Sequence, residues 1–291
     1  MKNKGLTITM VFAAESSNYG EGYSNLTVLK KMTRGDANQY SYISRQAMRY
    51  NIVEQMGCND TPVTAENKVV QFSPEATIVD YPEIDLFGYM KTMSKKQDKE
   101  GKGGAATRSA VVRLSNAVAL EPFQNDLDFL TNMGLAKRIN GDNAIAQSEI
   151  HASYYAYTIA VDLDRVGEDG DIHLDGAEKA RRVNLLLDTI EFLYRDIKGR
   201  RENLAPFFVI GGIYDRKNPF FENRVKISKN RLHVEPLKEM LDCNNMLKGH
   251  THVGLLKGLL SNDDEIAEAM NIDTVGNVFA AIKKEVSDFY A

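Results

Sequence analysis

The sequence lacks tryptophan altogether and has only two cysteines, Cys58 and Cys243, in 291 residues. Two distant thiols cannot build a disulfide framework and do not have the spacing of a zinc site, so we expect both to be chemically inert. Also missing is any run of about 18 apolar residues, and the apolar stretch near the N-terminus is too short for a signal peptide. We therefore expect a cytoplasmic, globular protein with no membrane partner.

Sequence motifs for the common catalytic chemistries are absent as well. The chain has no Walker-type G-x-x-x-x-G-K-[ST], no G-x-G-x-x-G, no G-x-S-x-G and no H-E-x-x-H. His250 and His252 lie two residues apart, and Asp242 or Cys243 could join them as metal ligands. No complete ligand set is visible, so loop or surface histidines are the better interpretation. We expect no metal, no cofactor and no catalytic residue.

Charge is patchy along the chain. The formal net charge of −4 argues against a wholly basic nucleic-acid binder, but local clusters are what neutralise phosphates. Basic residues gather before position 50 and in "MKTMSKKQDKEGKGG" and "RDIKGRR", whereas acidic residues gather in "LDRVGEDGDIHLDGAE" and near the C-terminus. This asymmetry permits a polyanion to bind one face of the protein.

The first part of the chain predicts a strand, a loop and a helix. Alternating apolar and β-branched residues predict a strand over Gly5–Ala14. In the helix predicted from Tyr40 onward, Ser41, Arg45 and Arg49 recur at i, i+4 and i+8 and would form one stripe. An ordinary solvated face would explain this stripe, and so would a binding site for an anion.

Further cations favour the anion site over the solvated face. Lys30, Lys31 and Arg34 precede the predicted helix, where free backbone N–H groups and the helix dipole also attract anions. Together with the stripe, they predict a track for nucleic-acid phosphates.

Later segments complete the predicted fold. A basic loop is predicted over Lys91–Gly104, a strand over residues 151–163, a helix over Asp175–Lys198 capped by Asp175 and Glu178, and a buried strand over residues 205–214. Tyr155 and Tyr157 are predicted to pack in the core, because the RNP1 pattern of base-stacking aromatics is absent. The element order predicts an α+β sandwich of the ferredoxin-like, RNA-recognition-motif type with a long insertion.

Two adjacent glycines, Gly211 and Gly212, leave two interpretations open. Without a Cβ they would let a phosphate or a base approach the backbone closely. A bulge or a tight turn at the strand end would require them equally.

Four stretches resemble the backbone subunit of type I CRISPR effector complexes, the Cascade filament protein of the DevR family, subtype I-B, in the RAMP superfamily. They are "RGDANQYSYISRQAMRY", "EIDLFGYM", "TRSAVVRLSNAVALEPFQNDLDFLT" and "EIHASYYAYTIAVDLDRVG", and their order matches over residues 5 to 215. The resemblance implies a palm like an RNA-recognition motif, residues 1–60 and 152–291, with a fingers insertion, 61–118, and a thumb, 119–151. It implies helical filaments along guide RNA, with neighbouring copies and other Cascade subunits as partners.

The resemblance also implies roles for individual residues. The positions that match the family's phosphate contacts are Ser41 and Arg45 and, more loosely, Arg49, Lys31 and Arg34. The family's thumb disrupts base pairs between the guide and a target DNA strand, and the candidates for its apolar wedge are Phe123, Phe129, Leu130 and Met133. Packing of these side chains against the adjacent subunit is an equal alternative for each.

Three functions are weighed. The first is a non-catalytic guide-RNA-binding filament subunit in CRISPR antiviral defence. The second is a ribonuclease resembling the type III backbone subunits, which cleave target RNA with an Asp before the first helix; Asp36 in "TRGDANQ" matches that place loosely. The third is a transcriptional regulator, although no helix-turn-helix with a basic recognition helix is evident. We favour the first.

Overall fold

The middle strand of the protein is β1, Gly5–Ala14, with the bounds that its alternating residues predict. In this computed structural model the described residues are 4–15, 18–20, 22, 24–66, 69–93 and 104–291. β1 pairs antiparallel with β13 (Ser153–Asp162) on one side and with β18 (Phe208–Tyr214) on the other. Segments far apart in the sequence therefore form the centre of one sheet.

This large sheet extends outward from β1 in both directions. Its order is β22 (Ile272–Asp273), β21 (His252–Leu255), β18, β1, β13, β10 (Ala117–Ala119), β4 (Gln39–Ile43) and β3 (Lys31–Thr33), and β9 (Val112–Leu114) also pairs with β13. The pairs are antiparallel except β21 with β22. The sheet thus contains strands from near both ends of the described chain.

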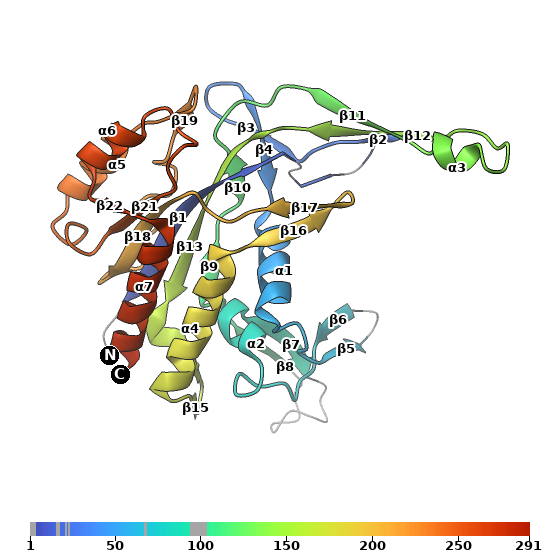
Figure 1. Cartoon of the computed structure of the whole chain (residues 1–291). Helices are drawn as coiled ribbons and strands as arrows, with labels where there is room; N and C mark the ends of the chain where they lie inside the picture. The colour runs from blue at the N-terminus through green and yellow to red at the C-terminus, as the bar shows by residue number, and fades with distance from the viewer. Residues whose placement is uncertain (1–3, 16–17, 21, 23, 67–68, 94–103) are drawn as a thin grey trace.

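Helices cover one face of the sheet. They are α1 (Arg45–Met56), α4 (Gly176–Glu191) and α7 (Val275–Tyr290) (Figure 1). Ile8 and Met10 of β1 and the buried rings of Tyr155 and Tyr157 of β13 point into this core, as alternation along a strand requires. The core role predicted for the two tyrosines is confirmed.

The segment after residue 215 covers the opposite face. It includes β19 (Ile227–Ser228), β20 (Arg231–Leu232), α5 (Glu235–Asp242) and α6 (Asp263–Ala269). Val11 of β1 and Ile210 of β18 point into this second core, which is separate from the helix-side core. The result is a mixed α/β protein with seven α-helices among its described residues, as the predicted class requires.

Two predicted helix boundaries are wrong. α1 begins at Arg45, because Ser44 is its N-cap and accepts a hydrogen bond from the Ala47 N–H, so Ser41 lies on strand β4 instead. α4 starts as predicted, with the Asp175 side chain accepting from the Glu178 N–H at 2.7 Å. It ends early, at Glu191.

A hairpin replaces the predicted end of α4. β16 (Tyr194–Ile197) pairs with β17 (Arg200–Asn203) through a two-residue turn, Lys198–Gly199, in which both residues have positive φ. Arg195, which lies within the predicted helix, is buried here and pairs with Glu202 at 2.5 Å.

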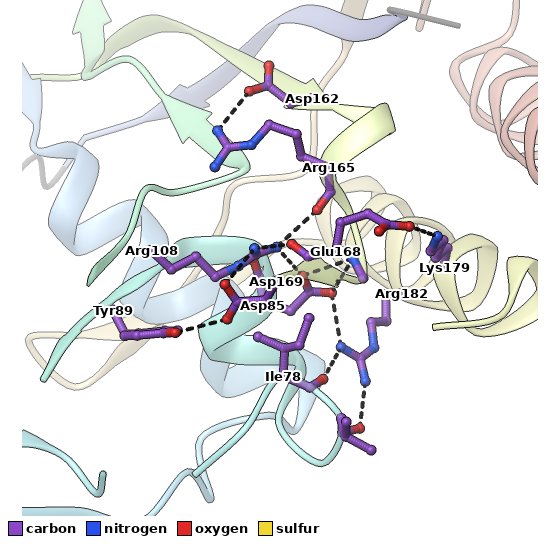
Figure 2. A network of polar contacts seen from close by, with 12 residues as sticks. Ile78, Asp85, Tyr89, Arg108, Asp162, Arg165, Glu168, Asp169, Lys179 and Arg182 are labelled. Atoms are coloured by element: carbon purple, nitrogen blue, oxygen red, sulfur yellow. Dashed lines mark hydrogen bonds and ion pairs between the residues drawn. The ribbon is translucent and has the colours of Figure 1, made fainter. Parts of the chain in front are cut away.

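The described residues between 61 and 108 form a small lobe below the large sheet (Figure 1). It contains β5 (Val63–Glu66), β6 (Val69–Phe72), α2 (Pro82–Phe87), β7 (Tyr89–Met93) and β8 (Gly104–Arg108). A buried carboxylate, Asp85, fastens this lobe to the rest of the molecule (Figure 2). It accepts from Arg108 at 2.6 Å, from Arg182 of α4 at 2.9 Å and from the Gly167 N–H at 3.0 Å.

Lys91 does not belong to a loop. It lies in β7, is buried, and donates to the carbonyl of Ala76, with its ammonium 4.2 Å from the Tyr89 ring. Burial lowers the pKa of Lys91. The remainder of the predicted basic loop, residues 94–103, lies outside the described residues.

Candidate nucleic-acid interface

A narrow arm projects from the body of the molecule (Figure 1). It consists of β11 (Asp126–Thr131), the short helix α3 (Met133–Ala136) at the tip, and β12 (Ile145–Ile150), with β2 (Leu26–Thr27) pairing parallel to β12 at the base. All six residues of β11 are exposed. The arm therefore has little core of its own and presents β11 and the first residues of β12 to its surroundings.

Apolar side chains are exposed along this arm. Phe129 is 60% exposed, Leu130 is 70% exposed and Met133 is 49% exposed. The structure brings these three predicted wedge residues together on the arm. Phe123 does not join them: it is half-buried at the base, with its ring 5.4 Å from the His151 ring. Its ring therefore already packs against the chain itself, and its role as a wedge stays a prediction.

An ion pair and a cation–π contact tie the base of the arm to the sheet. The Lys31 ammonium lies 2.7 Å from a carboxylate oxygen of Glu149 and 4.2 Å from the Phe123 ring centroid. The same carboxylate accepts from the Leu29 N–H at 2.8 Å. Lys31 is a predicted phosphate contact, but its charge is offset by Glu149, so its role in the single chain is to hold the arm.

A buried hydrogen-bond network lies next to the Lys31–Glu149 ion pair. Ser41 Oγ is 2.7 Å from His151 Nδ1 and 2.8 Å from the hydroxyl of Tyr155. Burial lowers the pKa of His151, which favours its neutral form. Ser41 is fully buried, so its predicted contact with a phosphate is wrong: a phosphate would have to displace the network that orients the arm.

A groove lined by charges of both signs runs between the sheet and the segment after residue 215. One hollow of about 760 Å³ is lined by Arg34, Tyr40, Lys226, Lys229 and His233. The Arg34 guanidinium stacks on the Tyr40 ring at 4.4 Å. Guanidinium and ammonium groups on a polar floor are what phosphate binding requires.

A second hollow continues the groove. It measures about 510 Å³ and shares Arg34 and Lys226 with the first, so these two cations bridge both hollows. Its floor includes Ser115, Asn116 and Thr158. Carboxylates also line the first hollow, namely Asp36, Glu121 and Asp126. Glu222 lines the second hollow, so carboxylates and cations share both hollows.

The two arginines of α1 have different surroundings. Arg45 is exposed, and its backbone N–H donates to the Asn116 side chain at 2.9 Å, which puts it at the edge of the groove. Arg49 is 3.9 Å from Glu83 and its guanidinium lies 5.0 Å from the Phe87 ring centroid. Arg45 therefore belongs with Arg34 and Lys226, whereas Arg49 is engaged with the small lobe.

For Gly211 and Gly212, the structure contradicts one of the two open interpretations, a contact with RNA. Both are buried in β18, between β1 and β21. A Cβ on Gly211 would lie 2.2 Å from the carbonyl oxygen of Thr7, and one on Gly212 would lie 1.9 Å from that of His250. The close approach that these glycines permit is of the protein's own backbone.

Asp36, the residue of the ribonuclease hypothesis, is held in a turn. Its carboxylate accepts from the Tyr40 hydroxyl at 2.5 Å and from the Asn38 N–H at 3.1 Å. The hydrogen bond from Tyr40 is the main cause that lowers the pKa of Asp36. Within the described ranges, no three His, Cys, Asp or Glu side chains converge as metal ligands would. Of the histidine pair, His252 contacts Glu285 at 2.7 Å.

The lysines and His233 of the groove are functional candidates that sequence reasoning misses. A signal for them is present: "RVKISKNRLH", Arg224–His233, carries four cations in ten residues. This cluster of cations alone does not identify a binding site, because nothing in the sequence shows that β19 and β20 fold back beside β4.

Comparisons with known proteins agree with this architecture. Residues 6–230 match the model of a family described as the CRISPR-associated negative auto-regulator DevR/Csa2. The CRISPR-associated protein Cas7/Cst2/DevR of Myxococcus xanthus (strain DK1622) is 30% identical over 164 residues, which are 50% of this chain and 53% of that protein. The chain thus spans about half the length of this curated relative.

Two solved chains share the fold. One, from a CRISPR RNA-guided surveillance complex described as pre-nicking, has a TM-score of 0.64 at 11% identity and covers 97% of this chain and 100% of its own. The other, from a CRISPR RNA-guided surveillance complex, has a TM-score of 0.59 at 14% identity, with coverages of 97% and 99%. No described helix has the length and apolar character needed to span a bilayer.

Proposed function

The chain belongs to the CRISPR-associated DevR/Csa2 family, and we propose that it is a non-catalytic subunit that binds guide RNA and polymerises into the helical backbone of a type I CRISPR interference complex, Cascade. In this role it would support pairing of the guide with a target DNA strand. Other Cascade subunits would be its further partners. The single observation that carries the proposal is the placement of the Arg34–Lys226 groove beside the base of a projecting apolar arm.

The proposed palm is ferredoxin-like. The order β18–β1–β13–β10, with α1 following β1 and α4 following β13, corresponds to the 4-1-3-2 arrangement of that fold. The fingers would be residues 61–118 and the thumb residues 119–151, so that the thumb contains the whole arm. Residues 1–60 and 152–291 would then form the palm.

Phosphate contacts supply the proposed affinity. Arg34 and Lys226 line one groove, and the Arg45 backbone contacts Asn116 of its lining, while base pairing rather than side chains would read the target. Binding that rests on phosphates is independent of sequence and weakens steeply with salt, because each contact releases counterions. Phe129, Leu130 and Met133 on the arm would insert between or pack beside bases.

An RNA-binding titration tests this function. We expect the chain to bind single-stranded RNAs of unrelated sequence with similar affinity, and Arg34→Glu or Lys226→Glu to weaken all of them alike. Lys284→Glu, which reverses an exposed charge on α7, is the matched control. Loss of RNA binding in the control as well, or strong dependence on sequence, would contradict the proposal.

Two assays address the other functions. RNA cleavage that requires a divalent metal and disappears in Asp36→Ala would establish the ribonuclease. A shift of duplex DNA in the absence of RNA would establish the regulator that the family description suggests. We expect neither, since Asp36 has no converging ligand set among the described residues.

A further inference from the structure

The turn between β3 and β4 places a carboxylate on the surface where RNA phosphates are proposed to bind. Asp36 is exposed there, two residues after Arg34, and both side chains line the same hollow. A carboxylate beside a phosphate site weakens binding, because like charges repel each other. The hydrogen bonds of Asp36 show what this side chain contributes instead.

The Asp36 carboxylate holds the backbone of the turn. It accepts from the Asn38 N–H at 3.1 Å and from the Asn38 side-chain amide at 3.2 Å. The turn closes with two backbone hydrogen bonds, from the Arg34 N–H to the Asn38 carbonyl at 3.1 Å and from the Ala37 N–H to the Arg34 carbonyl at 3.0 Å. Ala37 has a φ of 62°, in the left-handed region that a residue with a Cβ seldom adopts without support. Both backbone groups of Arg34 are therefore fixed by the turn that Asp36 stabilises.

The same carboxylate also holds the aromatic ring on which Arg34 lies. The Tyr40 hydroxyl donates to Asp36 at 2.5 Å. The Tyr40 ring is 7% exposed, and the Arg34 guanidinium lies 4.4 Å from its centroid. The hydrogen bond to Asp36 is the main cause that raises the pKa of Tyr40, so the hydroxyl stays a donor. Asp36 therefore fixes Arg34 in two ways, through the turn and through the ring.

This arrangement leaves the charge of Arg34 available. Arg34 makes no ion pair among the described residues, although Asp36 is two positions away. Lys31, by contrast, is paired with Glu149. A guanidinium stacked through its face keeps the N–H groups of its edge free, and that edge is what binds a phosphate with two hydrogen bonds. Arg34 is thus held in one orientation without losing its charge to a neighbour.

We propose that Asp36 and Tyr40 are positioning residues for Arg34, which they hold in the orientation that binds a phosphate of the guide RNA. The proposal deepens the proposed function and rests on it, because the ligand is the RNA backbone. Asp36 then raises the affinity for a polyanion although its own charge is negative. Its benefit comes from a smaller loss of side-chain freedom when Arg34 binds.

RNA titrations of three variants test this role by the sign of their effects. Asp36→Ala removes both the charge and the hydrogen bonds, and should weaken RNA binding by about fivefold. Asp36→Asn keeps an acceptor oxygen for Tyr40 and should bind RNA at least as tightly as the wild type. The matched control is Asp126→Ala, which removes a carboxylate from the same hollow. Asp126 is exposed and its side chain has no hydrogen bond among the described residues, so this change should strengthen binding. Strengthened binding in Asp36→Ala as well would overturn the proposal.

A double-mutant cycle shows whether Asp36 acts through Arg34. In an Arg34→Met background no guanidinium remains to be positioned, so Asp36→Ala should no longer weaken RNA binding. The same fivefold loss in both backgrounds would overturn the proposal, since Asp36 would then act on RNA or on the fold independently of Arg34. A general loss of folded protein in Asp36→Ala would give this second result.

Nuclear magnetic resonance of the arginine side chains provides a measurement that needs no RNA. Protons above the face of an aromatic ring are shifted to lower frequency, so the Arg34 side-chain N–H and methylene signals should be displaced; their absence from Arg34→Met identifies them. The displacement should persist in Asp36→Asn and should collapse in Asp36→Ala. An undisturbed displacement in Asp36→Ala would overturn the proposal.

The two proposals fail in different ways. A wild-type chain that shows the displaced Arg34 signals and binds no RNA would contradict the guide-RNA function, while the orientation of Arg34 by Asp36 would stand. RNA binding that is weakened in Arg34→Met and unaffected in Asp36→Ala would contradict the positioning role alone.

Discussion

Lys31 and Glu149 connect the sheet to the arm: the Lys31 ammonium is 2.7 Å from the Glu149 carboxylate, which also accepts from the Leu29 N–H. β3 carries the lysine and β12 carries the glutamate, so the pair spans the point where the arm leaves the body. Both side chains are largely buried, which makes the contact stronger than a surface ion pair.

Loss of this carboxylate should loosen the arm. We expect Glu149→Ala to lower the free energy of unfolding by about 1–3 kcal/mol, because a buried N–H and an ammonium lose their acceptor. Proteolysis should also begin in residues 126–150, the segment that the pair restrains. Limited digestion followed by mass spectrometry measures this. Cleavage that starts elsewhere in the variant would show that the pair does not hold the arm.

Asp85 should be essential for joining the small lobe to the body. Asp85→Ala leaves Arg108 and Arg182 buried without their shared carboxylate (Figure 2), a change that typically costs about 3–5 kcal/mol. Asp80→Ala removes an exposed carboxylate near the same lobe and should cost less than about 0.5 kcal/mol. Urea unfolding compares the two, and equal effects would refute the assignment.

Glu178 predicts a dependence of stability on pH. Hydrogen bonds from Arg181 and Arg182 lower the pKa of Glu178 to about 2, from 4.5. Because the folded pKa lies below the unfolded value, its contribution is present above pH 4.5 and is lost as the pH falls toward 2. The difference in urea midpoint between the wild type and Glu178→Gln should therefore shrink across that range. A constant difference would contradict the assignment.

Substitution of Gly211 should lower the stability of the fold and should not affect RNA binding directly. In Gly211→Ala the new methyl group would meet the Thr7 carbonyl, and the forced backbone shift should cost about 1–3 kcal/mol or more. Gly35 borders the groove, and a methyl group added there would meet no described atom within 4 Å, so Gly35→Ala is the control for a tolerated change. Thermal unfolding measures the loss of stability in each variant. A Gly211→Ala protein of normal stability that binds RNA poorly would restore the phosphate interpretation.

The salt dependence of RNA binding should identify phosphate contacts. Replacing Lys226 by Met should reduce the slope of log K against log salt by about 0.7, the value for one contact to a single strand. Lys31→Met should change the slope less, since Glu149 already offsets that charge. Binding isotherms at several salt concentrations provide the slopes. Equal changes in both variants would contradict the assignment of Lys31 to the arm.

Local patterns predict the parts of the fold that local forces decide. The alternation in Gly5–Ala14 and the cap at Asp175 are predicted correctly, because strand faces and helix starts depend on neighbouring residues. The predicted end of α4 is wrong, since the Lys198–Gly199 turn and the buried Arg195–Glu202 pair override a continuing helical pattern. Tertiary contacts outweigh propensity there.

The candidate site is harder to predict for the same reason. Arg34 and Arg45 are identified from their sequence neighbourhood, but Lys226 joins them only through the folding of residues 216–233 against the sheet. The spacing of Ser41 from Arg45 fits a helix face, whereas the Ser41 hydroxyl lies on a strand and is used by His151. Spacing alone cannot show which polar group is already satisfied.

We propose that this chain coats guide RNA as a filament, and nuclease protection measures that coating. The chain would be expressed with a CRISPR repeat–spacer transcript and purified at moderate salt, and its RNA would be digested and sized. We predict protected fragments in a ladder of regular increments, lost when Arg34 and Lys226 are changed to Glu and kept in Lys284→Glu. A nucleic-acid-free monomer, or protection without regular increments, would contradict the account.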